Sequence, residues 1–172
     1  GAYSWEGTSY DLPVDEPAFG TSLHGFVAFQ DWQVDRADAS CVQLSTLIAA
    51  RYSYPWTLLA SARYSLDARA GLAVELSATN VGQGTAPLGV GFHPYLAVDG
   101  IAADDLELTN PASIIYEADA SMIPVAAHDV AGFGLDFRSP ARIGEAGLDH
   151  CFAGLPPGTW TVTLRDPDSG VG

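Results

Sequence analysis

The sequence predicts an all-β protein, a large antiparallel β-sandwich with many short strands and long loops. Three observations support this class. Apolar and polar residues alternate with a period of two along several segments. The 172 residues include 18 Gly and 11 Pro, which interrupt the chain at short intervals. No segment keeps an apolar stripe of helical spacing over three turns.

The clearest alternation predicts a hairpin. Between residues 72 and 79, Leu72, Val74, Leu76 and Ala78 alternate with smaller or polar residues. That pattern is typical of a half-buried antiparallel strand. Residues 59–66 form its predicted partner, and residues 67–71, which end in Gly, suit a hairpin loop. The sequence therefore predicts two paired strands on either side of this loop.

Further strands are predicted at residues 42–48, 106–108, 114–116 and 160–164, each from apolar residues at alternate positions. Gly- and Pro-rich turns separate these segments. Long loops in folds of this kind usually carry the functional site. Two loop-like stretches contain histidine, one at residues 21–26 and one leading to His93, and we expect function there.

The charge balance excludes several classes of partner. Acidic residues number 21 and basic residues 7, all of them Arg, so the net charge is −14. Such a chain is poorly suited to nucleic acid or to an anionic membrane, and favours a neutral or small partner. No apolar run approaches the roughly 20 residues of a membrane helix. Cys41 and Cys151 make no disulfide framework, and we expect them to be reduced and buried in a cytoplasmic protein.

His93 is the most informative candidate site residue. Gly89 and Gly91 precede it and permit close approach of a ligand or a neighbouring strand, while Pro94 favours an extended backbone at His93. A histidine in this setting can act on a ligand as a general acid. The alternative is a core histidine whose nitrogen is satisfied by a backbone carbonyl. The spacing of these residues leaves both interpretations open and by itself favours the second.

Two further polar residues are candidates, each with a structural alternative. His24 follows a loop that contains Pro and Gly, and by itself this position favours a plain surface or N-cap-like residue over a functional one. Asp149 can accept a hydrogen bond from a ligand hydroxyl, or it can be a solvated turn carboxylate. If residues 149–151 form a strand, Asp149 and Cys151 share one face and His150 lies on the other. Cys151 is then a poor nucleophile, because the adjacent histidine points away from it.

No metal or nucleotide cofactor is predicted. The four histidines show none of the spacings that bind metal, and the two cysteines are 110 residues apart. The sequence also lacks a glycine-rich phosphate loop between a strand and a helix. Four Trp and seven Tyr are consistent with stacking on the C–H faces of sugar rings, but a role in a β-sheet core explains most of them.

Taken in order along the chain, several short motifs resemble the aldose 1-epimerase (galactose mutarotase) family. LHG (23–25) resembles its first histidine motif, GFHPY (91–95) its second, and LDHCF (148–152) a later segment. Residues 1–12 and 54–80 resemble its early and central hairpins, and the motifs cover nearly the whole chain. The resemblance implies the family's galactose mutarotase-like supersandwich, with residues 1–172 forming a single domain.

The resemblance also implies an activity, the interconversion of α and β anomers of free hexoses such as glucose or galactose. His93 would protonate the ring oxygen, and a carboxylate base would take the proton of the anomeric hydroxyl. The ring would open, C1–C2 would rotate, and the ring would close on its other face. His24 and Asp149 would hydrogen-bond the sugar. The reaction needs an acid and a base but no cofactor.

The sequence departs from the family pattern at both ends. The family's base is a Glu in the C-terminal third, and a sugar-contacting Arg lies before the first hairpin. We expect both to lie outside residues 1–172, so we predict that the domain is incomplete. The six glutamates present are Glu6, Glu16, Glu75, Glu107, Glu117 and Glu145, and none sits in the context of that base.

Two alternatives follow. The first is a catalytically silent carbohydrate-binding β-sandwich module, which would keep Asp149 and the aromatic residues without needing His93 as an acid. The second is an epimerase of phosphorylated hexoses, which would need basic residues near the sugar. We rank the second lower because the four arginines of the first half, Arg36, Arg51, Arg63 and Arg69, form no tight cluster in the sequence.

Overall fold

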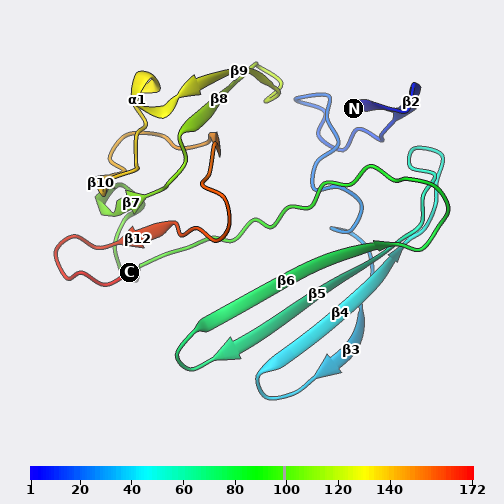
Figure 1. Ribbon diagram of the computed structural model, residues 1–172, viewed down its shortest axis with the longest axis horizontal. Coiled ribbons are helices and arrows are strands. Elements are labelled where there is room, and N and C mark those ends of the chain that lie inside the picture. The colour runs from blue at the N-terminus through cyan, green and yellow to red at the C-terminus, as the bar shows by residue number, and fades with distance from the viewer. Residues whose placement is uncertain (99) are drawn as a thin grey trace. The chain divides into compact units, whose positions relative to one another are not determined.

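The computed structural model describes residues 1–98 and 100–172 and is almost entirely β (Figure 1). Among these residues the helical segments are η1 (Ala103–Asp105) and α1 (Val130–Phe133). The sequence predicted no helix, and each segment is about one turn long. Asp129 caps α1 by accepting a hydrogen bond from the Ala131 amide, and Gly134 ends it with a φ of 84°. The all-β, antiparallel fold predicted from the sequence is confirmed.

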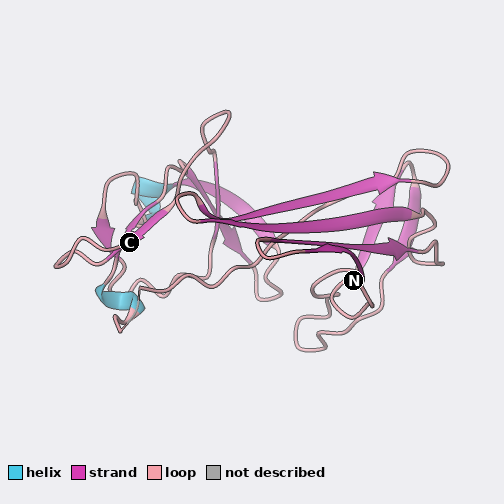
Figure 2. Cartoon of the chain, turned by 90° about the horizontal axis from the view of Figure 1, so that it is seen from below, coloured by secondary structure: helices cyan, strands magenta, loops and turns pink. Residues whose placement is uncertain are grey.

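The chain folds as two compact units, Gly1–Phe92 and His93–Gly172. The first unit contains a short hairpin and a four-stranded antiparallel sheet of order β3-β4-β5-β6. The hairpin consists of β1 (Ala2–Trp5) and β2 (Thr8–Asp11). The sheet strands are β3 (Gln33–Ala37), β4 (Cys41–Ile48), β5 (Leu58–Asp67) and β6 (Gly71–Asn80). Three of them, β4, β5 and β6, are the longest strands among the described residues (Figure 2).

The predicted central hairpin is confirmed as β5 and β6. Its loop is tighter than predicted, because Asp67 pairs with Gly71 and only residues 68–70 connect the strands. The Asp67 carboxylate accepts hydrogen bonds from the amides of Arg69 and Ala70, each at 2.8 Å. Gly71 has a φ of 77°, which a side-chain-bearing residue adopts only with strain. The hydrogen bonds of Asp67 and the positive φ of Gly71 therefore allow a three-residue loop where five residues were predicted.

The two faces of this sheet differ in chemistry, as period-two alternation requires. One face is polar: Ser61 and Ser77 are hydrogen-bonded at 2.8 Å, and Arg63 contacts Glu75 at 3.3 Å. The other face is apolar, since the opposite positions carry aliphatic side chains. Several of these are substantially exposed: Val34, Val42, Leu66, Leu72 and Leu76.

The core of the first unit lies at one end of the sheet. Ile48, Tyr54, Trp56, Leu58 and Ala60 are buried there. Aromatic side chains of the β1–β2 hairpin and of the segment after it pack against this cluster: Tyr3, Trp5, Tyr10, Phe26 and Trp32. Most aromatic residues of the first unit thus serve as core, which was the structural alternative to sugar stacking.

The second unit contains two three-stranded antiparallel sheets, of order β10-β7-β12 and β11-β8-β9. Leu106, Ile115 and Val130 are its largest fully buried side chains. The strands are β7 (Glu107–Thr109), β8 (Ile114–Ala118), β9 (Pro124–Asp129), β10 (Ala141–Arg142), β11 (Cys151–Ala153) and β12 (Thr163–Arg165).

The strand predicted at residues 160–164 is only partly correct. β12 spans Thr163–Arg165, while Trp160 and Val162 lie before it and are exposed. The partner strand explains the difference. β12 pairs with β7, which is three residues long, so no backbone remains for residues 160–162 to pair with on that strand. The strands predicted around residues 106–108 and 114–116 are confirmed as β7 and β8, shifted or extended by one or two residues.

Candidate functional site

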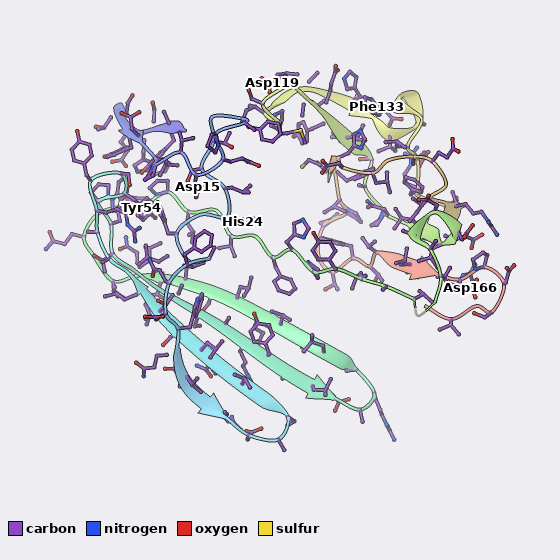
Figure 3. All side chains as sticks on the ribbon, turned by 180° about the vertical axis from the view of Figure 1, so that it is seen from behind. Asp15, His24, Tyr54, Asp119, Phe133 and Asp166 are labelled. Atoms are coloured by element: carbon purple, nitrogen blue, oxygen red, sulfur yellow. The ribbon has the colours of Figure 1, made fainter. Side chains whose placement is uncertain are left out.

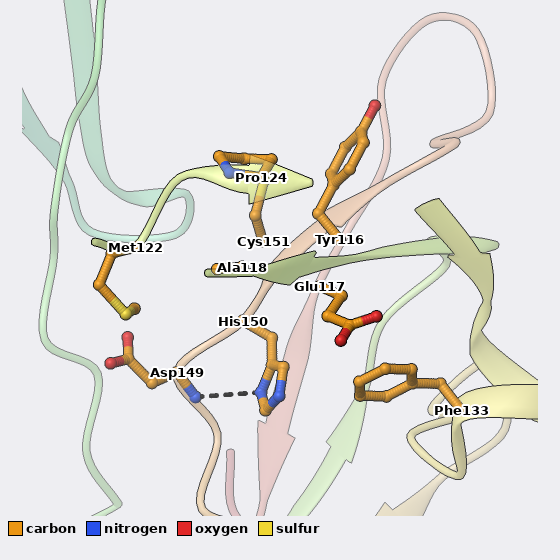
Figure 4. A pocket seen from close by; sticks show the side chains of 9 residues that line it. All are labelled: Tyr116, Glu117, Ala118, Met122, Pro124, Phe133, Asp149, His150 and Cys151. Carbon is orange, nitrogen blue, oxygen red and sulfur yellow. Dashed lines mark hydrogen bonds between the residues drawn. The ribbon is translucent and has the colours of Figure 1, made fainter. Parts of the chain in front are cut away.

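A cavity of about 480 Å³ lies in the second unit, where β8 ends and β11 begins (Figure 4). Its volume is in the range of small-molecule sites. The cavity is lined by side chains of β8, the β8–β9 turn, α1 and the segment entering β11: Tyr116, Glu117, Ala118, Met122, Pro124, Phe133, Asp149, His150 and Cys151. Of the sequence-predicted site residues, Asp149 lines this cavity.

Asp149, His150 and Cys151 all line the cavity, which corrects the prediction that His150 lies on the opposite face. The reason is local. β11 begins only at Cys151, so Asp149 and His150 precede it and do not follow strand alternation. The Cys151 side chain is exposed, so the prediction of a buried cysteine is wrong here, whereas Cys41 is buried as predicted. Both thiols are free.

Phe133, His150 and Glu117 line the cavity, and His128, which is outside the lining, contacts two of these side chains. Phe133 stands between two imidazoles, with ring centroids 5.4 Å from His128 and 5.7 Å from His150. His128 donates from Nε2 to Glu117 Oε2 at 2.9 Å, which orients that carboxylate. The Asp149 amide donates to His150 Nδ1 at 3.3 Å, so the neutral His150 ring carries its proton on Nε2. This part of the lining thus combines an apolar ring with a hydrogen-bond acceptor and a donor.

The opposite side of the cavity depends on a tight turn between β8 and β9. The Asp119 carboxylate accepts hydrogen bonds from the amides of Ser121 and Ile123 at 2.8 and 3.0 Å. This turn holds Met122 at a φ of 60°, which non-glycine residues seldom adopt. Figure 4 shows the Met122 side chain beside the Asp149 carboxylate. An apolar side chain therefore stands next to the acid that sequence reasoning singled out.

The chemistry of the lining favours an uncharged, hydroxyl-rich ligand. The charged side chains in the lining are Glu117 and Asp149, and both are acidic. Carboxylates accept hydrogen bonds from hydroxyl groups, and Met122 and Phe133 can contact C–H surface. A phosphate or carboxylate ligand would be repelled by these two acids. Among the described residues, no group of three or more His, Cys, Asp or Glu side chains is arranged to hold a metal ion.

His93 is the first residue of the second unit and lies in a segment without regular secondary structure. Its side chain is exposed, which does not fit the alternative of a buried core histidine. The imidazole lies against Tyr95, with ring centroids 5.2 Å apart. His93 does not belong to the described lining of the cavity that contains Asp149.

His24 belongs to the first unit, whereas His93 and Asp149 both belong to the second. Its side chain is exposed, and its backbone has a φ of 59°, followed by 63° at Gly25. Figure 3 labels His24 together with Asp15 and Tyr54 of the same unit. The amide of Leu23, the residue before His24, donates a hydrogen bond to the Asp15 carboxylate at 2.6 Å.

Sequence reasoning missed Glu117, Met122 and Phe133. No local motif marks them, because each lies in a different element: β8, the β8–β9 turn and α1. One signal was available for the turn. Asp119 stands four residues before Ile123-Pro124, an arrangement in which an Asp side chain commonly caps a turn between two strands. This signal predicts the turn between β8 and β9. It does not predict which side chains of the hairpin lie near Asp149.

No helix among the residues that the structure describes has the length and apolar character needed to cross a membrane. The two helical segments described above are each about one turn long.

Comparison with known proteins finds one matching family and one curated relative. The sequence profile of the family described as aldose 1-epimerase matches residues 1–172. The uncharacterized protein YihR of Escherichia coli K12 is 33% identical over 171 residues, which is 99% of this chain and 55% of YihR. The chain thus spans about half the length of this relative.

Two solved structures share the fold. A GalM/aldose epimerase homologue from Caenorhabditis elegans superposes with a TM-score of 0.78 and 24% identity, covering 98% of this chain and 55% of that one. An Escherichia coli K12 protein named as a candidate aldose 1-epimerase gives a TM-score of 0.76 and 23% identity, over 98% and 54%. The profile match over the whole sequence, together with this shared fold, identifies the chain as a member of the aldose 1-epimerase family.

Proposed function

We propose that this chain carries the sugar-binding part of an aldose 1-epimerase that acts on uncharged hexoses. The observation that carries the proposal is the position of Asp149 in a cavity with apolar side chains and with no Arg or Lys among the described residues that line it. Asp149 would accept a hydrogen bond from a sugar hydroxyl, and Met122 would contact the C–H surface of the ring. The lining disfavours a phosphorylated hexose, since its two charged side chains are acidic.

In the proposed reaction, His93 donates a proton to the ring oxygen while a carboxylate takes the proton of the anomeric hydroxyl. The C1–O5 bond breaks, and the sugar becomes an open-chain aldehyde. Rotation about C1–C2 and reversal of the proton transfers close the ring as the other anomer. We assign His24 a hydrogen bond to the sugar and expect the base to be a Glu outside residues 1–172. Each well-placed acid or base contributes about 10² to 10⁴ in rate.

Binding of D-galactose and D-glucose to the chain, measured by titration calorimetry, tests the first part of the proposal. We expect Asp149→Asn to weaken hexose binding at least about tenfold, because a carboxylate acceptor is lost. Asp104→Asn is the matched control, since Asp104 is an exposed acid of the same unit outside the cavity lining. Equal affinity of the wild type and Asp149→Asn, or tighter binding of glucose 6-phosphate than of glucose, would contradict the proposal.

Polarimetry of freshly dissolved α-D-galactose distinguishes the enzyme from the second candidate, a silent carbohydrate-binding module. The chain joined to the sequence that supplies the base should accelerate mutarotation, and His93→Asn should abolish that acceleration while hexose affinity is kept. The exposure of His93 favours the enzyme, because a core histidine would be unable to reach a ligand. Binding without acceleration in any form of the polypeptide would support the module.

We also propose that residues 1–172 belong to one larger β-sandwich domain and that the protein works in the cytoplasm. The two free thiols support the compartment. Alkylation of both cysteines in cells lysed directly into denaturant is the expected result, since Cys41 is buried in the folded chain, and a Cys41–Cys151 disulfide would contradict it. Limited proteolysis of the longer polypeptide should not release residues 1–172 as a stable fragment.

A further inference from the structure

We propose that Asp15 is the positioning residue for His24. Its carboxylate fixes the backbone directly before His24, so that the imidazole is held in place before a sugar arrives. The inference deepens the proposed function and rests on it, because there His24 hydrogen-bonds the hexose. The resemblance to the family gives Asp15 no role, because Asp15 lies outside the LHG motif at residues 23–25.

The backbone at His24 needs an external restraint. His24 has a φ of 59°, in the left-handed region that a residue with a side chain adopts only at an energetic cost. Gly25 follows with a φ of 63°, so the chain reverses at these two residues. Such strain persists only where surrounding contacts enforce it, and it is concentrated at ligand sites.

Asp15 supplies the contact on the N-terminal side. Its Oδ1 accepts a hydrogen bond from the Leu23 amide at 2.6 Å, across eight residues of sequence. Charge-assisted hydrogen bonds of this kind are short and stronger than neutral ones. Figure 3 shows Asp15 and His24 in the same region of the first unit.

The loop that carries Asp15 is itself closed. Glu16 and Thr21 pair as an antiparallel bridge, with the Glu16 amide donating to the Thr21 carbonyl at 3.1 Å. The Thr21 hydroxyl also donates to the Glu16 carboxylate at 3.0 Å. Because Asp15 is adjacent to this bridge, its carboxylate has a defined position from which to hold Leu23.

Phe26 supplies the contact on the C-terminal side. Its ring packs on the buried Tyr54 with a centroid separation of 5.0 Å, and Arg51 lies over it at 4.7 Å. His24 and Gly25 therefore lie between two fixed points, the Asp15 contact before them and the Phe26 contact after them. Phe26 belongs to the core, whereas the Asp15 contact is exposed and can be removed without a cavity.

Three variants separate positioning from general stability. Asp15→Ala removes the acceptor for the Leu23 amide, and Asp15→Asn keeps a side-chain oxygen in the same place. Asp67→Ala is the matched control, because Asp67 also caps backbone amides in an exposed turn of the first unit, at the β5–β6 loop. His24→Gln serves as the reference for losing the imidazole itself.

Amide hydrogen exchange and D-galactose affinity are measured on all of these proteins. We expect Asp15→Ala to accelerate exchange at Leu23 and to weaken galactose binding roughly threefold to tenfold. Asp15→Asn should restore most of both, and Asp67→Ala should change neither. Unchanged exchange at Leu23 in Asp15→Ala would overturn the inference, as would equal loss of affinity in Asp15→Ala and Asp67→Ala.

The proposed function can fail separately from this inference. If wild type and His24→Gln bind galactose equally, or neither binds, the sugar-binding role of His24 is wrong. Exchange at Leu23 then still decides whether Asp15 fixes the backbone before His24, because that measurement needs no sugar.

Discussion

Leu66 and Leu72 lie directly opposite each other across β5 and β6, and 62% and 63% of their respective surfaces are exposed. They share the apolar face of the four-stranded sheet, while the opposite face carries serines and an Arg–Glu pair. An exposed apolar face of a sheet promotes association, because water is released when it is covered.

The first prediction concerns this pair. Replacing both residues, Leu66→Ser and Leu72→Ser, should slow aggregation of the chain several-fold and lower its binding of a fluorescent apolar dye. Leu59→Ser is the control, since Leu59 is exposed on the polar face of the same sheet. Light scattering against time is the measurement. If the control slows aggregation as much as the double variant does, the apolar face is not the cause.

The second prediction concerns acid stability. The Arg138 guanidinium hydrogen-bonds the Asp136 carboxylate at 2.8 and 2.6 Å and, with the Arg138 amide, lowers the pKa of Asp136 from 3.8 to about 2. A lowered folded-state pKa contributes stability that is present above about pH 4 and lost as the pH falls towards about 2.

We therefore expect the pKa of Asp136 to rise part of the way towards its ordinary value in Arg138→Met, because the backbone amide at position 138 still donates to the carboxylate, and acid unfolding between about pH 4 and pH 2 to become less steep. Carbon-detected NMR measures the first and circular dichroism the second. The stability effect should be small, because the pair is only two residues apart and can persist in the unfolded chain. An unchanged Asp136 midpoint would show that Arg138 is not the cause.

The third prediction concerns the strand that carries Glu117 to the cavity. Ile115 is completely buried and pairs with His128 on one side and Phe152 on the other. Ile115→Ala should destabilise the second unit by about 2–5 kcal/mol, through lost burial and the cavity left behind. Urea unfolding measures this cost, with Ile114→Ala, which is less buried, as the comparison. Similar costs for the two variants would contradict the burial argument.

The fourth prediction concerns Tyr54, the core residue against which Phe26 packs. The Tyr54 hydroxyl donates to the Pro87 carbonyl at 2.7 Å, and burial raises the pKa of Tyr54 above its ordinary value. Tyr54→Phe should cost about 0.5–1.5 kcal/mol, because the carbonyl loses its donor. Tyr52→Phe, at a residue that is 96% exposed, should be neutral. Thermal unfolding compares the two.

The raised pKa of Tyr54 also predicts how the stability of the chain changes at high pH. Since the folded pKa is raised, its stabilising contribution is complete below about pH 10 and is lost as the pH rises through the folded value. The fall in stability above pH 10 should therefore be shallower in Tyr54→Phe than in wild type. An identical alkaline profile would mean that another group dominates.

Much of the fold could be predicted from the sequence because strand alternation is local. Leu72, Val74 and Leu76 indicated both the strand and its apolar face, and β5 and β6 confirm the hairpin. The same reasoning failed at Trp160 and Val162, because strand ends depend on the length of the partner, and β7 is short. It also placed His150 wrongly, since β11 starts only at Cys151, two residues after the supposed start at Asp149.

By itself the sequence determined the all-β class, the central hairpin and the candidacy of His24, His93 and Asp149, since these follow from residue types and their short-range order. Only the tertiary structure decided that Glu117, Met122 and Phe133 gather around Asp149, and that Asp15 holds the backbone before His24. Those contacts join residues from separate elements or across a closed loop. Their formation depends on strand register and turn geometry, which neighbouring residues in the sequence do not specify.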